Sequence, residues 1–509
     1  MRLINSIKNA IIAFIMNCIT IIIGFIAQKI FVTTLGNEYL GINGLFSNIL
    51  SMLAVIELGF GSAIICNLYK PIAQNNIKVI NILMSFYKKI YRIIAIIILI
   101  LGILVMPFLK HIVGDVNIKE NIALLFFLAL MDVVFSYMLT YKRSILYADQ
   151  KSYIINMVHI IYTILLNCTQ ILFLYITHNF VFYLVIKIIF RILENIVITI
   201  FANKMYPYIC EKTKERISKE LKNDIYKKVK GLVFHRIGSA FVLGTDNIII
   251  SKFLGVITVG LYSNYSMIIN AVTNLLGQIF SSITAVIGNL LIENNVEKSY
   301  DIYKKMLLLN SWIFAWASTS IFCVIQPFIS LWLGESYLIS IYVVAVLVLN
   351  FYITGMRKTS NTFKEAAGIF YEDRFVPIIE SIINIVFSVI LVKALGLIGV
   401  FIGTTISSLV LFLYSYPVLV YKRLFKRAYS NFILEHFKYM MISILGVVIS
   451  MFICNLIIIN SLLIKISIYI VISFIVPNLL YYIIFRKTKE FMYYKNILGD
   501  FKKRKIKNS

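Results

Sequence analysis

IIAIIILILGILVMPFL, residues 93–109, runs for seventeen residues without one charged side chain. Similar apolar runs recur along the chain with basic residues between them, among them IIAFIMNCITIIIGFIA (11–27) and LFFLALMDVVFSYML (125–139). A bilayer core of about 30 Å needs roughly 20 apolar residues for each helical span. Because the runs are continuous and do not alternate with a period of two, they predict membrane-spanning helices rather than a barrel.

The composition of the whole chain agrees with these runs. Of its 509 residues, 60% are hydrophobic and only 14% are charged, and the mean hydropathy is +0.88, whereas soluble domains carry about 25% charged residues. The sequence therefore predicts an all-α polytopic membrane protein with about fourteen transmembrane helices. The first is too long for a signal peptide and lacks a small-residue cleavage site, so we expect it to be retained. The predicted spans are 10–32, 43–66, 90–109, 119–140, 154–176, 179–202, 233–253, 259–285, 306–327, 338–356, 375–394, 397–420, 438–459 and 463–485.

The basic residues predict the orientation. With the N-terminus inside, 40 of the 49 Lys and Arg residues fall in cytoplasmic segments and 5 in outer loops, which is the bias of membrane proteins. Both termini are therefore expected in the cytoplasm. The net charge of +26 then faces the anionic inner leaflet, so it does not indicate a nucleic-acid partner. The six cysteines form no CxxC pair, which argues against a disulfide framework and against a metal site.

One basic segment divides the spans into two groups of six with a further pair behind. The segment is EKTKERISKELKNDIYKKVKG (211–231), and its apolar residues Ile217, Leu221, Ile225 and Val229 recur every four positions. This spacing predicts an amphipathic helix on the membrane surface. The expected organisation is an N-terminal six-helix lobe, a cytoplasmic amphipathic linker, a C-terminal six-helix lobe, the last two transmembrane helices and a basic cytoplasmic tail. Their bounds are 1–203, 204–232, 233–421, 422–485 and 486–509.

The two lobes carry a repeated motif. TLGNEYLGINGLFSN (34–48) and FLGVITVGLYSNY (253–265) both read Leu-Gly, a short gap, then Gly-Leu-aromatic-Ser-Asn, and ALGLIGVFIGT (394–404) is a weaker third copy. Because an even number of spans separates the first two copies, they run in the same direction through the membrane. This pattern is typical of a parallel repeat related by an axis along the membrane normal.

The chain resembles the polysaccharide transporter family of Wzx-type oligosaccharide flippases, within the superfamily that also holds multidrug extrusion antiporters and peptidoglycan-lipid flippases. Three stretches carry the resemblance: LGNEYLGINGLFSNILSMLAVIELGFGSAI (35–64), HRIGSAFVLGTDNIIISKFLGVITVGLYSNY (235–265) and FKEAAGIFYEDRFVPIIESIINIVFSVILVKALGLIGVFIGT (363–404). The resemblance implies two six-helix lobes around a central cavity. It also implies movement of undecaprenyl-diphosphate-linked oligosaccharide to the outer leaflet by alternating access, for surface polysaccharide such as lipopolysaccharide or capsule, alongside other polysaccharide assembly proteins.

Polar side chains inside the spans are the candidate cavity residues, because a charge at mid-span costs about 2.5–3.5 kcal/mol when it faces lipid. Helical geometry places His235 and Asp246 on one side of the seventh span, with Arg236 about 80° away. A guanidinium pairs well with phosphate, and Asp246 offers a titratable group for coupling. The candidate substrate-binding residues are Arg236, Asp246, His235, Lys187, Arg191, Asn270, Asn274, Gln278, Gln28 and Glu380.

Structural roles compete with these functional ones. Lys187, Arg191 and Glu194 stand at i, i+4 and i+7, which suits an internal ion-pair ladder as well as a phosphate site. The amides of the eighth span can simply pack helix against helix. Asp132 lies alone in its span, and Glu57 lies near a span end, where a structural contact is favoured.

The sequence offers little support for an enzyme. It has no Gly-Lys dipeptide for a P-loop, no pair of aspartates two residues apart and no large outer loop. A cation-coupled multidrug antiporter of the same superfamily is the alternative to a flippase, and an assembly scaffold is a third reading. Four basic residues within spans, Lys29, Lys187, Arg191 and Arg236, favour an anionic cargo. The expected partners are a lipid-linked oligosaccharide and membrane lipids. No metal or cofactor is indicated, and proton or sodium coupling stays open.

Overall fold

The computed structural model contains helices joined by short connections, and no strand occurs among the residues that it describes. These are 2–57, 60–114, 116, 118–211, 217–219, 222–223, 225, 244–292, 295–369 and 372–497. Helices satisfy every backbone N–H and C=O within one segment, which is what a lipid environment demands. The predicted all-α polytopic fold is therefore confirmed. The chain divides into two compact units, Met1–Ser263 and Asn264–Ser509, and each is described by itself.

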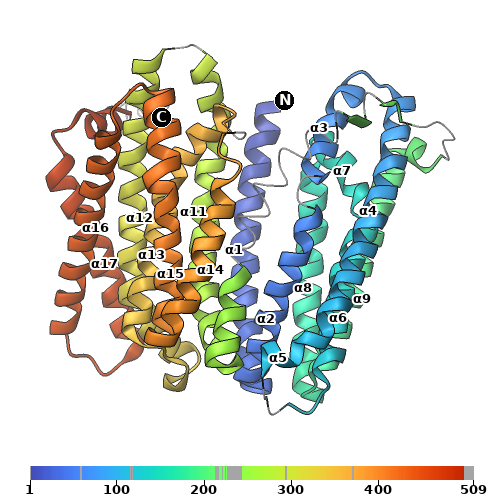
Figure 1. The fold of residues 1–509 in the computed structure, drawn as a ribbon, viewed down its shortest axis with the longest axis horizontal. Coiled ribbons are helices and arrows are strands. Elements are labelled where there is room, and N and C mark those ends of the chain that lie inside the picture. The colour runs from blue at the N-terminus through green and yellow to red at the C-terminus, as the bar shows by residue number, and fades with distance from the viewer. Residues whose placement is uncertain are drawn as a thin grey trace, which may run out of the picture. The chain divides into compact units, whose positions relative to one another are not determined.

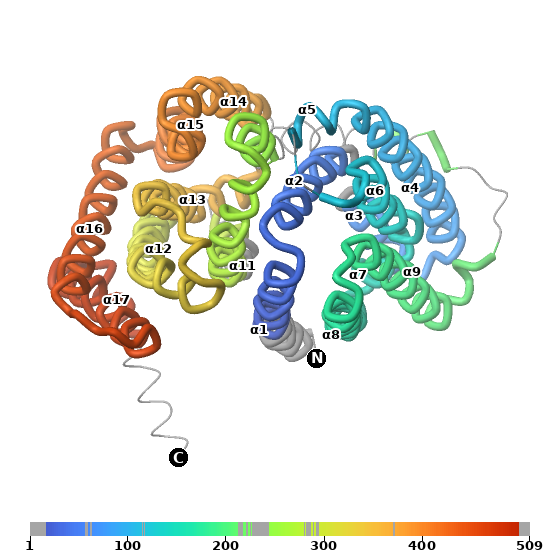
Figure 2. The backbone as a smooth tube through the Cα atoms, turned by 90° about the horizontal axis from the view of Figure 1, so that it is seen from below, coloured from blue at the N-terminus to red at the C-terminus, as the bar shows by residue number. Residues whose placement is uncertain are grey.

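Unit 1 contains the helices from α1 to α9 and the start of α11 (Figures 1 and 2). The chain bends by 48° between α6 and α7, just where the fourth predicted span, 119–140, ends. The chain ends α6 at Met138 and starts α7 at Tyr141. The elements are α1 (Arg2–Leu35), α2 (Asn37–Leu53), η1 (Ala54–Glu57), α3 (Phe60–Ala73), α4 (Ile77–Val105), η2 (Met106–Phe108), α5 (Leu109–Val113), α6 (Ile122–Met138), α7 (Tyr141–Ala148), α8 (Ser152–Thr177), α9 (Phe180–Met205), η3 (Pro207–Cys210), helical residues 244–254 and the start of α11 (Val256–Ile292).

Unit 2 contains the rest of α11 and the last spans, with α12, α13, α14 and α15 packed beside one another and α16 and α17 forming a final antiparallel pair (Figure 2). The elements after α11 are α12 (Val296–Trp332), η4 (Glu335–Tyr337), α13 (Ile341–Ala366), α14 (Val376–Leu395), α15 (Leu397–Val410), the π-helix η5 (Leu411–Leu424), α16 (Tyr429–Leu456) and α17 (Leu462–Phe485).

Each predicted span overlaps helical residues, although the second, 43–66, is divided among α2, η1 and α3. Of the seventh, residues 244–253 are helical, and residues 233–243 lie outside the described residues. By length and hydropathy alone, nine helices of the described part can cross a membrane, or ten when α6 and α7 count as one span. Helix α9 is not among the nine, since Lys187, Arg191 and Glu194 lie in its middle.

Asparagine side chains start several of the helices. Asn76 Oδ1 accepts from the backbone N–H of Val79 at the start of α4, and Asn121 Oδ1 accepts from Ala123 at the start of α6. Asn179 caps α9 in the same way through the N–H of Val181. A helix start leaves four N–H groups without an intrahelical partner, and an asparagine cap satisfies one of them.

The glycine of the repeated Leu-Gly motif adopts a backbone conformation that favours glycine in all three copies. Gly36, Gly255 and Gly396, the first glycines of the three copies, all have positive φ, at +92°, +86° and +63°. Each reverses the chain between two consecutive helices, and a side chain there would be strained. The first two copies also contact each other, because a Cβ on Gly260 would lie 2.4 Å from the carbonyl oxygen of Asn37. Small residues allow this close helix approach.

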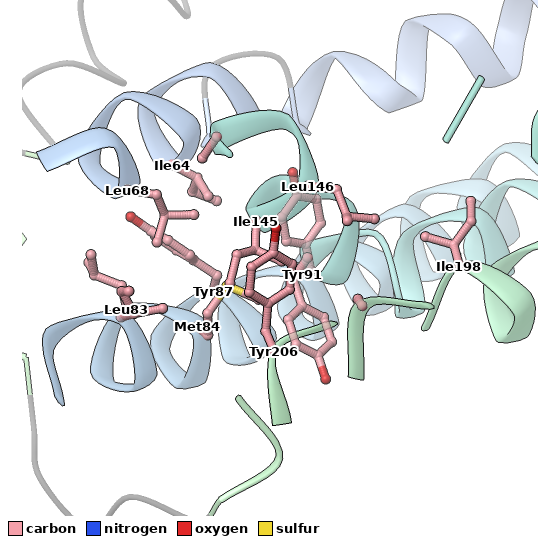
Figure 3. Close-up of a cluster of buried hydrophobic side chains, with 14 of the residues drawn as sticks. Ile64, Leu68, Leu83, Met84, Tyr87, Tyr91, Ile145, Leu146, Ile198 and Tyr206 are labelled. Atoms are coloured by element: carbon pink, nitrogen blue, oxygen red, sulfur yellow. The ribbon is translucent and has the colours of Figure 1, made fainter. Parts of the chain in front are cut away.

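Two isoleucines of the linker pack against helices of unit 1. Ile225 is fully buried, and Ile217 packs against the same cluster, which also holds Tyr87, Tyr91 and Ile145 (Figure 3). For these two isoleucines, the apolar face predicted to lie on the membrane surface instead covers the ends of α3, α4, α7 and α9. Leu221 and Val229 lie outside the described residues. The lobe boundaries at 204–232 and 421 stay a prediction.

The twelfth span changes its hydrogen-bond pattern halfway. It is α-helical to Val410 and π-helical from Leu411 to Leu424, with Pro417 inside. In a π-helix each N–H bonds to the carbonyl five residues earlier, so Pro417, which has no N–H, leaves the Phe412 carbonyl without that donor. The Tyr429 hydroxyl donates to the next carbonyl along the chain, on Leu413, at 2.8 Å. This hydrogen bond ties the start of α16 to η5.

Candidate functional site

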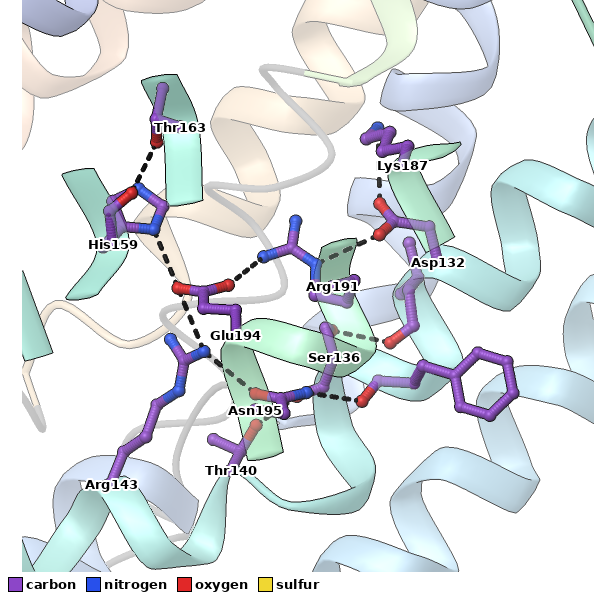
Figure 4. A network of polar contacts seen from close by, with 12 residues as sticks. Asp132, Ser136, Thr140, Arg143, His159, Thr163, Lys187, Arg191, Glu194 and Asn195 are labelled. Atoms are coloured by element: carbon purple, nitrogen blue, oxygen red, sulfur yellow. Dashed lines mark hydrogen bonds and ion pairs between the residues drawn. The ribbon is translucent and has the colours of Figure 1, made fainter. Parts of the chain in front are cut away.

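Glu194 on α9 is the centre of a network of charged side chains in unit 1 (Figure 4). Its carboxylate is completely buried. Oε1 accepts from His159 Nδ1 at 2.9 Å and lies 3.2 Å from Arg143 Nη2, and Oε2 accepts from Arg191 Nη1 at 3.0 Å. These donors come from α8, α7 and α9, so one carboxylate connects three helices.

Asp132 on α6 forms the second centre of this network. Arg191 Nε donates to Asp132 Oδ1 at 3.0 Å, and Lys187 Nζ lies 3.3 Å from Oδ2. Arg191 therefore bridges the two carboxylates with two nitrogens of one planar group, a geometry that lysine cannot reproduce. The face of Tyr162 supports the guanidinium at 5.3 Å from the ring centroid, a cation–π contact. We call Asp132, Arg143, His159, Lys187, Arg191 and Glu194 the charged cluster.

The charged cluster lies at the break between α6 and α7. A helix break leaves carbonyls without their usual donors, and here side chains supply the donors. Asn195 Nδ2 donates to the Phe135 carbonyl at 2.9 Å, and the Thr140 hydroxyl donates to that of Ser136. Arg143, in the first turn of α7, then reaches back to Asn195 Oδ1 at 2.9 Å. Irregular backbone inside a membrane is tolerated where protein or a watery cavity surrounds it, and it marks many transporter binding sites.

The cluster holds more positive than negative charge. Three permanent cations, Arg143, Lys187 and Arg191, face two carboxylates, which leaves one positive charge in excess before His159 is counted. The carboxylates are enclosed, at 7% exposed for Asp132 and 0% for Glu194, whereas the Lys187 side chain is 33% exposed and that of His159 is 50% exposed. The open side of the cluster therefore presents donors and cations. Such a surface suits an anion that brings several oxygen acceptors, such as a phosphate.

Of the predicted site residues, the structure brings Lys187 and Arg191 together. They form the ion-pair ladder that the i, i+4, i+7 spacing allowed, and the ladder extends to Asp132 on a neighbouring helix. Asp132 is therefore not isolated. Glu57 accepts from the Tyr91 hydroxyl at 3.0 Å, a structural contact within unit 1.

Glu380 takes part in a separate ion pair, in unit 2. Arg357 Nη2 on α13 donates to Glu380 Oε1 on α14 at 2.5 Å and to the Ser408 carbonyl on α15 at 3.1 Å. Glu380 is buried, and no excess of charge surrounds the pair within the described residues. This arrangement is typical of a structural tie between three helices at the point where α15 approaches the π-helix η5.

The remaining predicted residues lie on other segments of the chain. On α11, Asn270 and Asn274 are exposed and Gln278 is half-buried, and Asn270 Nδ2 donates to Ser266 Oγ on its own helix. Gln28 is half-buried on α1. Asp246 lies half-buried in the helical residues 244–254, beside the buried Thr245 and Asn247. His235 and Arg236 lie outside the described residues, so the face that they were predicted to share with Asp246 stays a prediction.

Sequence reasoning missed Arg143, His159 and Arg357. The predicted spans end at 140 and 356, so Arg143 and Arg357 fall just beyond them, in predicted cytoplasmic segments. The structure places the two arginines in α7 and α13. For His159, the available signal was a polar residue within an apolar span. Its pairing with Glu194 depends on the packing of α8 on α9, which no spacing within one helix reveals. No metal site is formed by His, Cys, Asp and Glu side chains in the part of the chain that the structure describes.

Comparisons with known proteins identify the fold. No protein-family model matches the sequence, and no curated protein matches it. Among solved structures, the lipid II flippase MurJ in an inward closed conformation matches with a TM-score of 0.67, covering 93% of this chain and 99% of that chain at 16% identity. A multidrug resistance MATE family transporter of the MOP superfamily matches in its inward-facing conformation with a TM-score of 0.59, covering 79% of this chain and 95% of that chain, also at 16% identity. The chain therefore has the fold of MOP superfamily transporters and flippases.

Proposed function

We propose that the protein is a flippase that moves undecaprenyl-diphosphate-linked oligosaccharide from the inner to the outer leaflet of a bacterial cell membrane, for surface polysaccharide synthesis. The observation that carries this proposal is the excess of positive charge in the charged cluster. Lys187, Arg191 and Arg143 offer donors toward the exposed side, while their carboxylate partners are enclosed. A diphosphate is the group of this cargo that such donors would bind.

A cation-coupled multidrug antiporter is the second candidate, favoured by the fold match to the MATE transporter. A cationic drug needs an accessible carboxylate. In the charged cluster, both carboxylates are already bound by arginine, lysine or histidine and are shielded from solvent. A cation entering there would have to displace an existing ion pair, which costs several kcal/mol when the carboxylate is buried. Within unit 1, the described charges therefore favour anionic cargo.

Other features of the chain suit a sugar-bearing lipid. Helix α11 exposes the amides of Asn270 and Asn274, and amide groups can both donate to and accept from sugar hydroxyls. The membrane potential can supply the energy. Two negative charges moved outward across an inside-negative potential of about 100 mV gain roughly 4–5 kcal/mol. Other polysaccharide assembly proteins would supply and consume the cargo.

A reconstitution experiment tests the proposal. The purified protein is placed in vesicles that contain a labelled oligosaccharide on a polyprenyl diphosphate, and the outward-facing sugar is detected with an impermeant probe. We expect protein-dependent flipping of the diphosphate lipid and no flipping of the same sugar on an uncharged polyprenyl carrier. Equal flipping of both lipids would contradict an anion-based mechanism. Uptake of a cationic dye driven by a proton or sodium gradient, without lipid flipping, would establish the antiporter.

A further inference from the structure

Unit 2 contains an apolar cavity whose lining includes no aspartate, glutamate, lysine or arginine. It measures about 190 Å³ and lies between α13, η5 and α16, with Phe412, Phe432 and His436 in its wall. A second cavity of about 130 Å³ lies between α12, α13 and α16. Tyr352 and Met440 line both cavities, so the two adjoin at these side chains. We call the two cavities together the α13–α16 slot.

The α13–α16 slot opens toward the bilayer. Leu413 and Phe437 line the first cavity and are each 54% exposed, and Val448 lines the second and is 58% exposed. All three belong to helices with apolar outer faces. An apolar chain can therefore enter the slot sideways from the lipid without crossing a polar surface.

His436 is the polar group in the wall of the first cavity, and its hydrogen bonds fix its tautomer. The residue is only 7% exposed. Its Nδ1 lies 2.9 Å from the Phe432 carbonyl, and because a carbonyl oxygen can only accept, Nδ1 carries the hydrogen. In the neutral ring, Nε2 is then an acceptor. Among the described residues no donor meets Nε2.

The aromatic neighbours hold the imidazole in place. Phe432 stacks on it with ring centroids 3.9 Å apart, and Phe412 meets it edge to face at 5.6 Å. The ring therefore has little freedom to turn Nε2 toward a partner elsewhere. A buried acceptor without a donor is unfavourable in a water-poor site, and a ligand that brings one donor removes that cost.

We propose that the α13–α16 slot binds a neutral lipid alcohol, a long apolar chain that ends in one hydroxyl, with this hydroxyl donating to His436 Nε2. The chain would lie along Tyr352 and Met440 toward the second cavity. An alkane leaves Nε2 without a donor, and an ionised fatty acid has no hydrogen to give. An alkylammonium would bring a charge into a cavity whose lining contains no carboxylate. No aspartate, glutamate, lysine or arginine lines either cavity, so binding of a lipid alcohol here does not depend on the cargo.

Thermal unfolding of the purified full-length protein with three probes of equal chain length tests the proposal: hexadecanol, hexadecane and hexadecanoate. We expect hexadecanol to raise the midpoint of unfolding clearly and the other two to have little effect. In His436→Phe, the affinity for hexadecanol should fall about tenfold, because one hydrogen bond is lost. His436→Gln, which keeps an acceptor oxygen, should retain most of it. His111→Phe, at an exposed histidine of unit 1, is the matched control and should bind as the wild type does.

Photo-crosslinking locates the ligand independently of stability. A hexadecanol with a photoreactive group should label peptides from α13 and α16 in the wild type. Labelling confined to other helices would overturn the proposal, as would equal binding of hexadecanol and hexadecane by the wild type. If His436→Phe does not fold, the three probes on the wild type and on His436→Gln still decide the question. A wild-type protein that does not prefer hexadecanol over hexadecane is sufficient to reject the site.

Discussion

Arg191 joins the two carboxylates of the charged cluster through one guanidinium. Arg191→Lys keeps the charge but reaches only one carboxylate at a time, and Arg191→Gln removes the charge. We expect Arg191→Gln to slow flipping of the lipid-linked oligosaccharide about tenfold, because one charge-assisted hydrogen bond to the diphosphate of the cargo would be lost. Arg191→Lys should give an intermediate rate. The measurement is the reconstituted flipping rate per folded molecule.

Arg423→Gln is the matched control for Arg191. Arg423 also pairs with one glutamate, Glu372, but its side chain is 57% exposed and lies outside the charged cluster. Its loss should leave the flipping rate unchanged, because exposed ion pairs contribute little. A wild-type rate in Arg191→Ala at normal protein levels would remove Arg191 from cargo handling.

Lys142 is a buried cation with a neutral partner. It is 5% exposed, and its Nζ donates to Asn203 Oδ1 at 2.7 Å, over the ring of Tyr141. Taking an ammonium group out of water costs several kcal/mol, and a neutral amide compensates this cost less than a carboxylate would. We therefore expect Lys142→Met to raise the midpoint of thermal unfolding. A fall would show that the Asn203 contact outweighs the desolvation of the ammonium group.

Asp246 stays the candidate for coupling. We propose that its carboxylate titrates or exchanges ion partners during transport, which its half-buried position within a span allows. Asp246→Asn keeps the shape and removes the charge. If Asp246 couples transport, the variant should reach normal levels and lose turnover or its pH dependence. If it only braces its helix, the variant should be scarce, with normal activity per molecule. Wild-type levels and a wild-type pH profile together would exclude both roles.

At the scale of one element, η5 depends on its neighbour. The Tyr429 hydroxyl donates to the Leu413 carbonyl and so ties the start of α16 to η5. Tyr429→Phe should lower the free energy of unfolding by about 0.5–1.5 kcal/mol, the net contribution of one hydrogen bond. Thermal unfolding measures the difference, and an unchanged stability in Tyr429→Phe would contradict this account.

The break between α6 and α7 shows how an element acquires function. A continuous helix would carry Arg143 straight on along the axis of α6, but the 48° bend lets it reach Glu194 and Asn195 on α9. The side chains that satisfy the free carbonyls at the break are the same ones that hold the charged cluster. Backbone irregularity and charge therefore depend on each other in this span.

At the scale of the whole molecule, the orientation rests on the distribution of Lys and Arg. In a variant without native cysteines, a cysteine at Glu335, an exposed position between α12 and α13, should react with an impermeant thiol reagent added outside intact cells. A cysteine at Ser218 in the linker should react only after the membrane is opened. The reverse pattern would invert the charge-based topology.

The features that could be predicted from the sequence are those set by interactions between residues close together along the chain. Hydropathy located the spans within several residues, and the i, i+4, i+7 spacing of Lys187, Arg191 and Glu194 indicated their ladder, because both are local along one helix. Span ends were less certain. Helix α13 continues to Ala366, since protein contacts such as the Arg357–Glu380 pair let charged residues extend a helix beyond its apolar part.

The sequence by itself determined that the chain is a helical membrane protein and approximately where its apolar spans lie. These properties follow from transfer free energies and backbone sterics that act over a few neighbouring residues. Only the tertiary structure decided that His159, Arg143 and Arg191 share one buried carboxylate, and that His436 faces an apolar cavity with an unmet acceptor. Those arrangements require side chains from different helices to meet. The crossing of packed helices sets which faces meet, and the period of any single helix does not contain that information.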